Sequence, residues 1–167
     1  MKGGKLLAQL TLWSFCCSTL FAAIPEYDRF PFTLPANSER LVAADVNGDS
    51  LNELITVVDD AIRIYFHRAN GFDFETGFGE ITFPGTSVGW DLSTNYSTDD
   101  RASIIALVNG TDAYVWPIEN ETILEPKLIK SELPGFLSKG VNRLFFSRDI
   151  NADSAEDLVI PGAGNLH

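Results

Sequence analysis

After its first 23 residues, the chain shows the apolar and polar alternation with a period of two that is typical of β-strands. The runs 53–58 and 103–108 are rich in Ile, Val and Leu and predict buried strands, and residues 61–67 alternate so that every second side chain is apolar. Turn-forming pairs separate the predicted strands, namely Asp59-Asp60, Asn70-Gly71 and Asn109-Gly110. No segment beyond residue 23 has a helical period. The pattern therefore predicts an all-β fold.

Residues 1–23 have a different pattern. Two lysines precede a mostly apolar run over residues 6–20, and Ala22-Ala23 is a small-residue pair typical of a cleavage site. This arrangement predicts a secretory signal peptide, because the run is shorter than the roughly 20 residues that a membrane-spanning helix needs. An uncleaved anchor helix is the alternative. Cleavage would remove both cysteines, so we expect a secreted mature chain with no disulfide and no membrane span.

Two nine-residue segments share a pattern of oxygen-bearing side chains. Asp45–Glu53 and Asp149–Asp157 each carry such side chains at positions one, three, five and nine. The segment Asp91–Asp99 fits the same pattern in a weaker form, with two carboxylates instead of three. The three segments start 46 and then 58 residues apart, which is a spacing found in propeller blades and other repeat arrays.

A short loop in which alternate side chains carry oxygen is suited to calcium, which takes six to eight hard oxygen ligands. Three carboxylates within nine residues repel one another unless a cation lies between them. We therefore expect structural calcium in the first and last loops, whereas the middle loop is expected either to bind weakly or to be only a turn. The expected ligands are Asp45, Asn47, Asp49, the carbonyl of Leu51 and Glu53 in the first loop, Asp91, Ser93, Asn95 and Asp99 in the middle loop, and Asp149, Asn151, Asp153, the carbonyl of Ala155 and Asp157 in the last loop.

Ordinary turns and helix–loop–helix calcium sites share part of this residue pattern. Asp, Asn, Gly and Ser also dominate ordinary turns, but two full matches in one pattern make that explanation improbable. A helix–loop–helix calcium site starts in the same way, but it needs Gly at position six and Glu at position twelve. Position six is serine in both full matches, and position twelve is Thr56 or Ile160. The flanking residues are also β-branched rather than helical.

These residues resemble the FG-GAP/VCBS repeat family, which builds the seven-bladed β-propeller of integrin α subunits and occurs in many bacterial secreted proteins. The family pattern is Asp-x-(Asp/Asn)-x-Asp-x-x-x-Asp, followed by Leu and a hydrophobic strand. Asp45–Ile55 matches it with Glu53 in place of the final Asp, and Asp157–Gly164 is similar to the stretch that follows. The resemblance covers about residues 41–167. It implies a partial β-propeller of antiparallel four-stranded blades, with two blades and the start of a third.

The sequence departs from the family in two ways. Glycine is missing at position six of all three loops, where Ser50, Tyr96 and Ser154 stand. Two units and a fraction are also too few for a propeller, which typically has four to eight blades, and an open array would expose sheet edges. We therefore expect a fragment of a longer chain, or completion by strands of another copy. The expected organisation is a signal peptide (1–23), a lead-in segment (24–39) and a repeat region (40–167).

The composition is acidic, with 12 Lys and Arg against 23 Asp and Glu, a formal net charge of −11, and −13 once the signal peptide is removed. This charge argues against binding to nucleic acid or to an anionic membrane surface. Only two histidines exist, His67 and His167, and no Ser-His-Asp arrangement is indicated. The carboxylate pairs Asp59-Asp60 and Asp99-Asp100 are better explained as turn residues. The tryptophans Trp90 and Trp116 are expected between blades.

The expected function is that of a secreted calcium-binding repeat protein with a binding, adhesion or scaffold role and no catalysis of its own. Its partner would be an extracellular protein or carbohydrate that the sequence does not identify. The expected location is outside the cell, or the periplasm or cell surface of a bacterium. The alternative is the N-terminal accessory part of a secreted carbohydrate-active enzyme whose catalytic residues lie beyond this chain.

Overall fold

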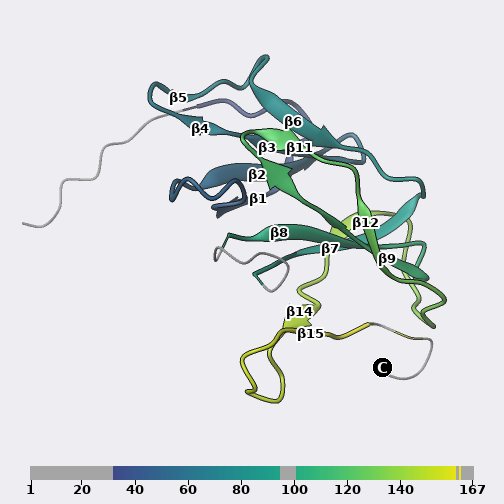
Figure 1. The fold of residues 1–167 in the computed structure, drawn as a ribbon. Helices are drawn as coiled ribbons and strands as arrows, with labels where there is room; N and C mark the ends of the chain where they lie inside the picture. Colours follow the sequence, from purple (N-terminus) through teal and green to yellow (C-terminus); the bar gives the residue numbers. More distant parts are fainter. Residues whose placement is uncertain (1–31, 95–100, 161, 163–167) are drawn as a thin grey trace, which may run out of the picture. The chain divides into compact units, whose positions relative to one another are not determined.

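The computed structural model describes residues 32–94, 101–160 and 162, and those from 33 onward belong to one compact unit. All the regular structure in this part of the chain is β-strand (Figure 1), as the alternation predicts. The expected signal peptide and the first part of the lead-in segment lie outside the described residues. The described residues contain no helix long and apolar enough to cross a membrane.

The first sheet is a four-stranded antiparallel meander. Its strands, in spatial order, are β1 (Glu39–Ala44), β2 (Glu53–Val58), β3 (Ala61–Tyr65) and β6 (Phe78–Ile81). The two-residue turn Asp59-Asp60 joins β2 to β3, and both residues have positive φ, which is the geometry of a tight hairpin. A small hairpin of β4 (His67–Arg68) and β5 (Gly71–Phe72) lies between β3 and β6 in the chain.

The second sheet has five strands. In spatial order they are β12 (Lys127–Lys130), β9 (Asp112–Trp116), β8 (Ser103–Val108), β7 (Ser87–Ser93) and β13 (Gly140–Arg143). Four of them form an antiparallel meander, interrupted by the small hairpin of β10 (Ile118–Glu119) and β11 (Thr122–Ile123). Strand β13 pairs with β7 in parallel. This fifth, parallel strand differs from the four-stranded antiparallel blade that the resemblance implies.

The last described strands form a short antiparallel hairpin, β14 (Ser147–Arg148) and β15 (Asp157–Leu158). A single bridge between Gly135 and Gly162 ties the end of this segment to the chain before β13. The described residues thus make two larger sheets and three two-stranded hairpins, and they do not form a closed propeller.

Apolar side chains from the two larger sheets form one buried cluster, and Figure 1 shows these sheets as neighbouring layers. Ile62, Ile64 and Phe66 contribute to the cluster, so the face predicted from the alternation is confirmed. Trp90 and Trp116 lie in the same cluster and are 0% and 4% exposed, so both are buried among apolar side chains of the two sheets.

A second cluster lies on the other face of β8. Ile105 and Leu107 of β8 pack there with Phe146 and Ile160, which come from the C-terminal segment. Because alternate residues of β8 enter the two clusters, this strand is buried on both faces. Strand β8 therefore contributes side chains to both apolar clusters of the described residues.

Candidate functional site

Three of the hairpin loops carry the expected ligand pattern, namely those that join β1 to β2, β7 to β8 and β14 to β15. Each loop is closed by one antiparallel residue pair. The pairs are Ala44 with Glu53, Ser93 with Ser103, and Arg148 with Asp157. Eight residues lie between the paired residues in the first and last loops, and nine lie between them in the middle loop. The first and last loops therefore share one length and one place in their hairpins.

In the first loop, side-chain oxygens accept hydrogen bonds from the backbone of the same loop. Asp45 accepts from the N–H groups of Gly48 (2.7 Å) and Ser50 (2.8 Å). The side chains at positions three and five, Asn47 and Asp49, each accept from the N–H two residues later, at 2.9 and 2.8 Å. These bonds curl the backbone around its own oxygen-bearing side chains.

The last loop repeats most of these bonds at the same positions, except that Asp149 accepts from the N–H of Asp153 at position five (3.2 Å), whereas Asp45 accepts from Gly48 at position four. Asp149 accepts from the N–H of Ser154 at 2.9 Å, five residues later, as Asp45 does in the first loop. Positions three and five again accept from the N–H two residues later, at 2.9 and 2.8 Å. In both loops the carboxylate at position nine accepts from the N–H at position two, at 2.9 Å for Glu53 and 3.1 Å for Asp157. The same spacing of polar residues has therefore produced the same local structure twice.

The backbone angles of the two loops also agree. Position four has positive φ in both, with 85° at Gly48 and 61° at Ala152. Position six has positive φ as well, with 68° at Ser50 and 71° at Ser154. This left-handed conformation favours glycine, because a Cβ crowds the following carbonyl oxygen. Three of these four positions thus carry a side chain in a conformation that costs free energy, and the loop pattern is kept despite that cost.

Glu53 is the most informative residue of the first loop. Its side chain is fully buried, and its Oε1 atom makes no hydrogen bond within the described structure. Burial raises the pKa of Glu53, and the nearby charges of Asp49 and Asp45 raise it further. The Val46 N–H donates to Oε2, and the His67 N–H lies near the carboxylate outside hydrogen-bond geometry; both favour the charged form but do not outweigh burial. A buried carboxylate with an unsatisfied oxygen and two acidic neighbours is electrostatically unfavourable without a cation.

The donors of the two loops fit a hard cation. Each loop offers three carboxylates, one asparagine amide and one backbone carbonyl at the expected positions, and all of these donors are oxygens. A carboxylate has about four acceptor positions, so the backbone hydrogen bonds leave lone pairs available. In the described part of the chain, His, Cys, Asp and Glu side chains alone form no group of three or more able to hold a metal ion. The three carboxylates of the first loop and the three of the last loop therefore do not meet this condition in the described structure.

The middle loop does not match the expectation from the sequence. Asp91 and Ser93 lie within β7, upstream of the loop, because the strand continues to the pair formed by Ser93 and Ser103. The residue that closes this loop is Ser103, which has no carboxylate. The other two expected ligands, Asn95 and Asp99, lie outside the described residues. The alternation of Val88, Trp90 and Leu92 could have indicated that the strand runs this far.

Asp91 has partners of another kind. It is fully buried, and its carboxylate accepts a hydrogen bond from the N–H of Ser147 at 3.1 Å. Arg143 lies 3.4 Å from Oδ1 and Arg148 lies 3.8 Å from Oδ2. Asp91 therefore joins β7 to the C-terminal segment through two arginines and a backbone amide. Sequence reasoning missed this cluster, because each of the three partners is 52 or more residues away from Asp91 in the chain.

Glu156 forms a second link that sequence reasoning missed. It accepts hydrogen bonds from the hydroxyls of Ser93 and Ser147, and from the N–H and the hydroxyl of Thr94. Burial raises its pKa, but the hydrogen bonds from Ser147, Ser93 and Thr94 together outweigh burial and lower the pKa below its usual value. Glu156 is thus held as a carboxylate.

The residues weighed for catalysis have structural surroundings. The His67 ring stacks on the Phe72 ring, with centroids 4.7 Å apart. Asp59 and Asp60 form the tight turn between β2 and β3 and are exposed. His67 therefore packs against an aromatic ring, and the Asp59-Asp60 pair is a solvated turn, as expected from the sequence.

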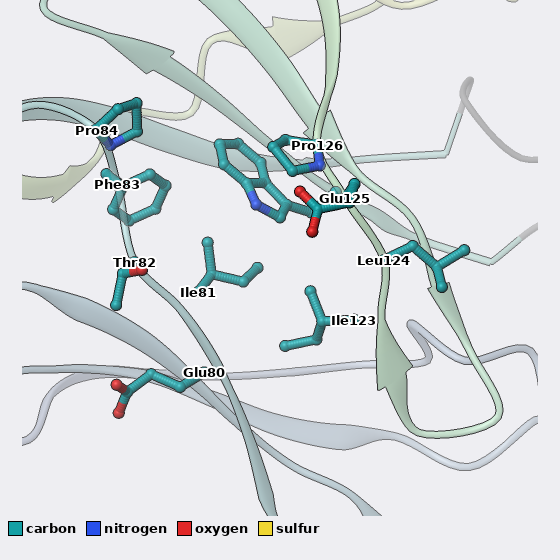
Figure 2. A pocket seen from close by; sticks show the side chains of 10 residues that line it. Glu80, Ile81, Thr82, Phe83, Pro84, Ile123, Leu124, Glu125 and Pro126 are labelled. Atoms are coloured by element: carbon teal, nitrogen blue, oxygen red, sulfur yellow. The ribbon is translucent and has the colours of Figure 1, made fainter.

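A pocket of about 480 Å³ lies between β6 with its following segment and the segment that follows β11. Figure 2 shows Phe83 and Pro84 on one side of it and Leu124 and Pro126 on the other. Its remaining lining residues are Glu80, Ile81, Thr82, Trp116, Ile123 and Glu125. Phe83 meets the Trp116 ring edge to face, at 5.3 Å between centroids. The lining of the pocket thus mixes apolar and polar surface, and the two charged residues that line it are acidic.

No family model, no curated protein and no solved structure matches this chain.

Proposed function

We propose that this chain is a secreted, calcium-stabilised repeat protein of the FG-GAP/VCBS type and that it acts by binding rather than by catalysis. The observation that carries the proposal is the buried Glu53 carboxylate, whose Oε1 has no hydrogen-bond partner in the described structure and which has Asp45 and Asp49 as neighbours. The matching hydrogen bonds of the last loop support a second site of the same kind.

The arrangement of the sheets supports the repeat part of the proposal. The first loop lies between the first two strands of a four-stranded antiparallel sheet, and the last loop lies within a hairpin of the same pattern. Sheets that share apolar faces in sequence order are also what neighbouring propeller blades would form. We propose that the two sheets correspond to two blades and that β14 and β15 belong to a third.

Each residue of the loop would have a distinct role in holding the ion. Asp45, Asn47 and Asp49 are oriented by backbone amides, so little conformational entropy remains to be lost on binding. Glu53 would supply the oxygen that lacks a partner. Calcium would supply positive charge, which offsets the repulsion among three carboxylates and the burial of one of them.

The pocket in Figure 2 supports a binding role. Its interior residues Ile81 and Trp116 are 2% and 4% exposed, and prolines at positions 84 and 126 limit backbone motion on both walls. A pocket that combines apolar side chains with the acidic residues Glu80 and Glu125 suits a partner that has an apolar group next to a positive charge.

Thermal unfolding with calcium and with chelator tests the metal assignment. An ion at 100 times its Kd would stabilise the fold by about 2.7 kcal/mol per site, which is several degrees in Tm. Glu53→Gln gives a sharper test, because it removes the buried charge. In chelator this variant should be as stable as the wild type or more stable, and in calcium it should be less stable.

Asp60→Asn is the matched control, since it removes one acidic charge from an exposed turn outside the loops. It should show the calcium response of the wild type. The metal assignment is wrong if calcium and chelator give the same Tm for the wild-type protein.

A further inference from the structure

Glu156 connects the last loop to the end of β7. Its Oε1 accepts hydrogen bonds from the N–H of Thr94 at 3.3 Å and from the Thr94 hydroxyl at 3.1 Å. Its Oε2 accepts from the hydroxyls of Ser93 and Ser147. Ser93 ends β7, Thr94 follows it, and Ser147 begins β14. The Glu156 carboxylate therefore joins the end of β7 to the start of the β14–β15 hairpin.

The loop itself places Glu156. This residue stands between Ala155 and Asp157, whose carbonyl and carboxylate are proposed ligands in the last loop. The Ala155 N–H donates to Asp153 at 2.8 Å, and the Ile150 N–H donates to Asp157 at 3.1 Å. An ion in the loop would fix these neighbours, and with them the backbone that carries Glu156. The corresponding position eight of the first loop is Asn52, which is exposed and uncharged.

The segment joined by Glu156 covers apolar surface of the second sheet. Phe146, next to Ser147, packs with Ile160 in the cluster on the outer face of β8. The Val159 N–H donates to the carbonyl of Phe146 at 2.8 Å, and the Ser147 N–H donates to buried Asp91. The Ser147 amide therefore reports whether the hairpin is docked on β7, whereas the Val159 amide, whose bond lies within the hairpin, reports whether the hairpin itself is formed.

We infer that calcium in the last loop controls how firmly the β14–β15 hairpin docks on β7, with Glu156 as the connecting carboxylate. The inference rests on the proposed function, since it requires an ion in the last loop. Coupling between two equilibria is reciprocal, so weakening the docking contact must weaken calcium binding at the last loop by the same factor. Position eight of the first loop is the uncharged Asn52 instead of a carboxylate, so the calcium affinity of the first loop should not change.

Ser147→Ala tests the coupling, because it removes one hydrogen-bond donor to Glu156 without changing a charge or a proposed ligand. In a calorimetric titration with calcium chloride, we expect the affinity of the last loop to fall about 5-fold or more and that of the first loop to stay unchanged. Asp153→Asn identifies the last-loop site by weakening or abolishing its heat signal. Ser138→Ala, an exposed serine outside the loops, is the matched control and should bind calcium as the wild type does.

Amide hydrogen exchange gives an independent readout on the same proteins. Calcium should slow exchange at the residue 147 amide of the wild type, which donates to Asp91 of β7, and it should slow it less in Ser147→Ala. Thr94→Val removes a second hydrogen-bond donor to Glu156, and it does so at an exposed position where no buried packing is disturbed. It should weaken calcium binding at the last loop and the slowing of exchange as Ser147→Ala does.

Equal last-loop affinity in both variants and the wild type would overturn the coupling, while calcium binding itself would stand. Calcium-independent exchange at the Ser147 amide of the wild type would overturn it in the same way. If calcium chloride gives no binding heat in the wild type, the proposed function fails, and the coupling fails with it.

Discussion

Ala152 has a backbone conformation that glycine adopts more readily. Its φ is 61°, and the equivalent residue of the first loop is Gly48, with φ of 85°. A side chain in the left-handed region costs roughly 1–2 kcal/mol, which glycine avoids. Glycine also raises the conformational entropy of the unfolded chain, and this opposing destabilisation is somewhat smaller than the strain that is relieved. We therefore expect Ala152→Gly to stabilise the protein by up to about 1 kcal/mol, measured as a rise of about 2–4 °C in Tm.

Ala69→Gly is the control for this prediction. Ala69 lies in an exposed turn and does not have positive φ, so the same substitution should only increase the entropy of the unfolded chain. It should lower the Tm. A decrease of equal size in Ala152→Gly would show that position four of the last loop is not strained.

Local patterns gave most of the strands but not their long-range pairing. The buried runs 53–58 and 103–108 became β2 and β8 with the expected limits, because alternation and β-branched residues report local structure directly. The parallel pairing of β13 with β7 joins residues more than 50 positions apart, and no local pattern encodes it. The sequence therefore predicted an all-β fold and left the fifth strand of the second sheet unpredicted.

The loops proposed to bind calcium show the same division between local and long-range structure. The first and last loops were predicted correctly as a structural pair, because their hydrogen bonds span at most seven residues. The middle pattern matched residue types but ignored where β7 ends, so it placed Asp91 in a loop when it lies in a strand. The contacts of Asp91 and Glu156 depend on tertiary packing, and the types of their neighbours in sequence gave no sign of them.

The turn between β8 and β9 packs closely against the segment before β13. A Cβ added at Gly135 would overlap the backbone carbonyl oxygen of Gly110 and would lie 2.9 Å from Ile160. A carbonyl in a tight turn has little freedom to move, so the C-terminal segment must shift instead. We expect Gly135→Ala to lower the free energy of unfolding by about 1–3 kcal/mol, measured by urea denaturation.

Gly71→Ala is the comparison, because a Cβ there would meet no atom within 4 Å although φ is 91°. It should cost about 1–2 kcal/mol from backbone strain alone. Only Gly135→Ala should also speed exchange of the Val159 amide, which donates to Phe146 in the C-terminal segment. Unchanged exchange at Val159 would show that the close contact between Gly135 and Gly110 does not position this segment.

Strand β8 links the two apolar clusters of the described residues into one cooperative unit. Ile104 enters the cluster between the two sheets, and Ile105 enters the cluster under the C-terminal segment. Neither cluster can lose its packing without exposing one face of the same strand, so both should unfold together when calcium is present. Calorimetry in calcium should therefore show one transition, with equal calorimetric and van't Hoff enthalpies.

Ile104→Val and Ile105→Val test this cooperativity from the two faces of β8. Each removes one buried methylene, which costs about 0.5–1.5 kcal/mol, and each should shift the whole transition without splitting it. The effects should also be similar by tryptophan fluorescence, which reports on Trp90 and Trp116 between the sheets, and by circular dichroism, which reports on all strands. If Ile105→Val lowers the midpoint by circular dichroism but leaves the tryptophan signal unchanged, the two clusters unfold independently. In that case β8 does not couple the C-terminal segment to the two sheets.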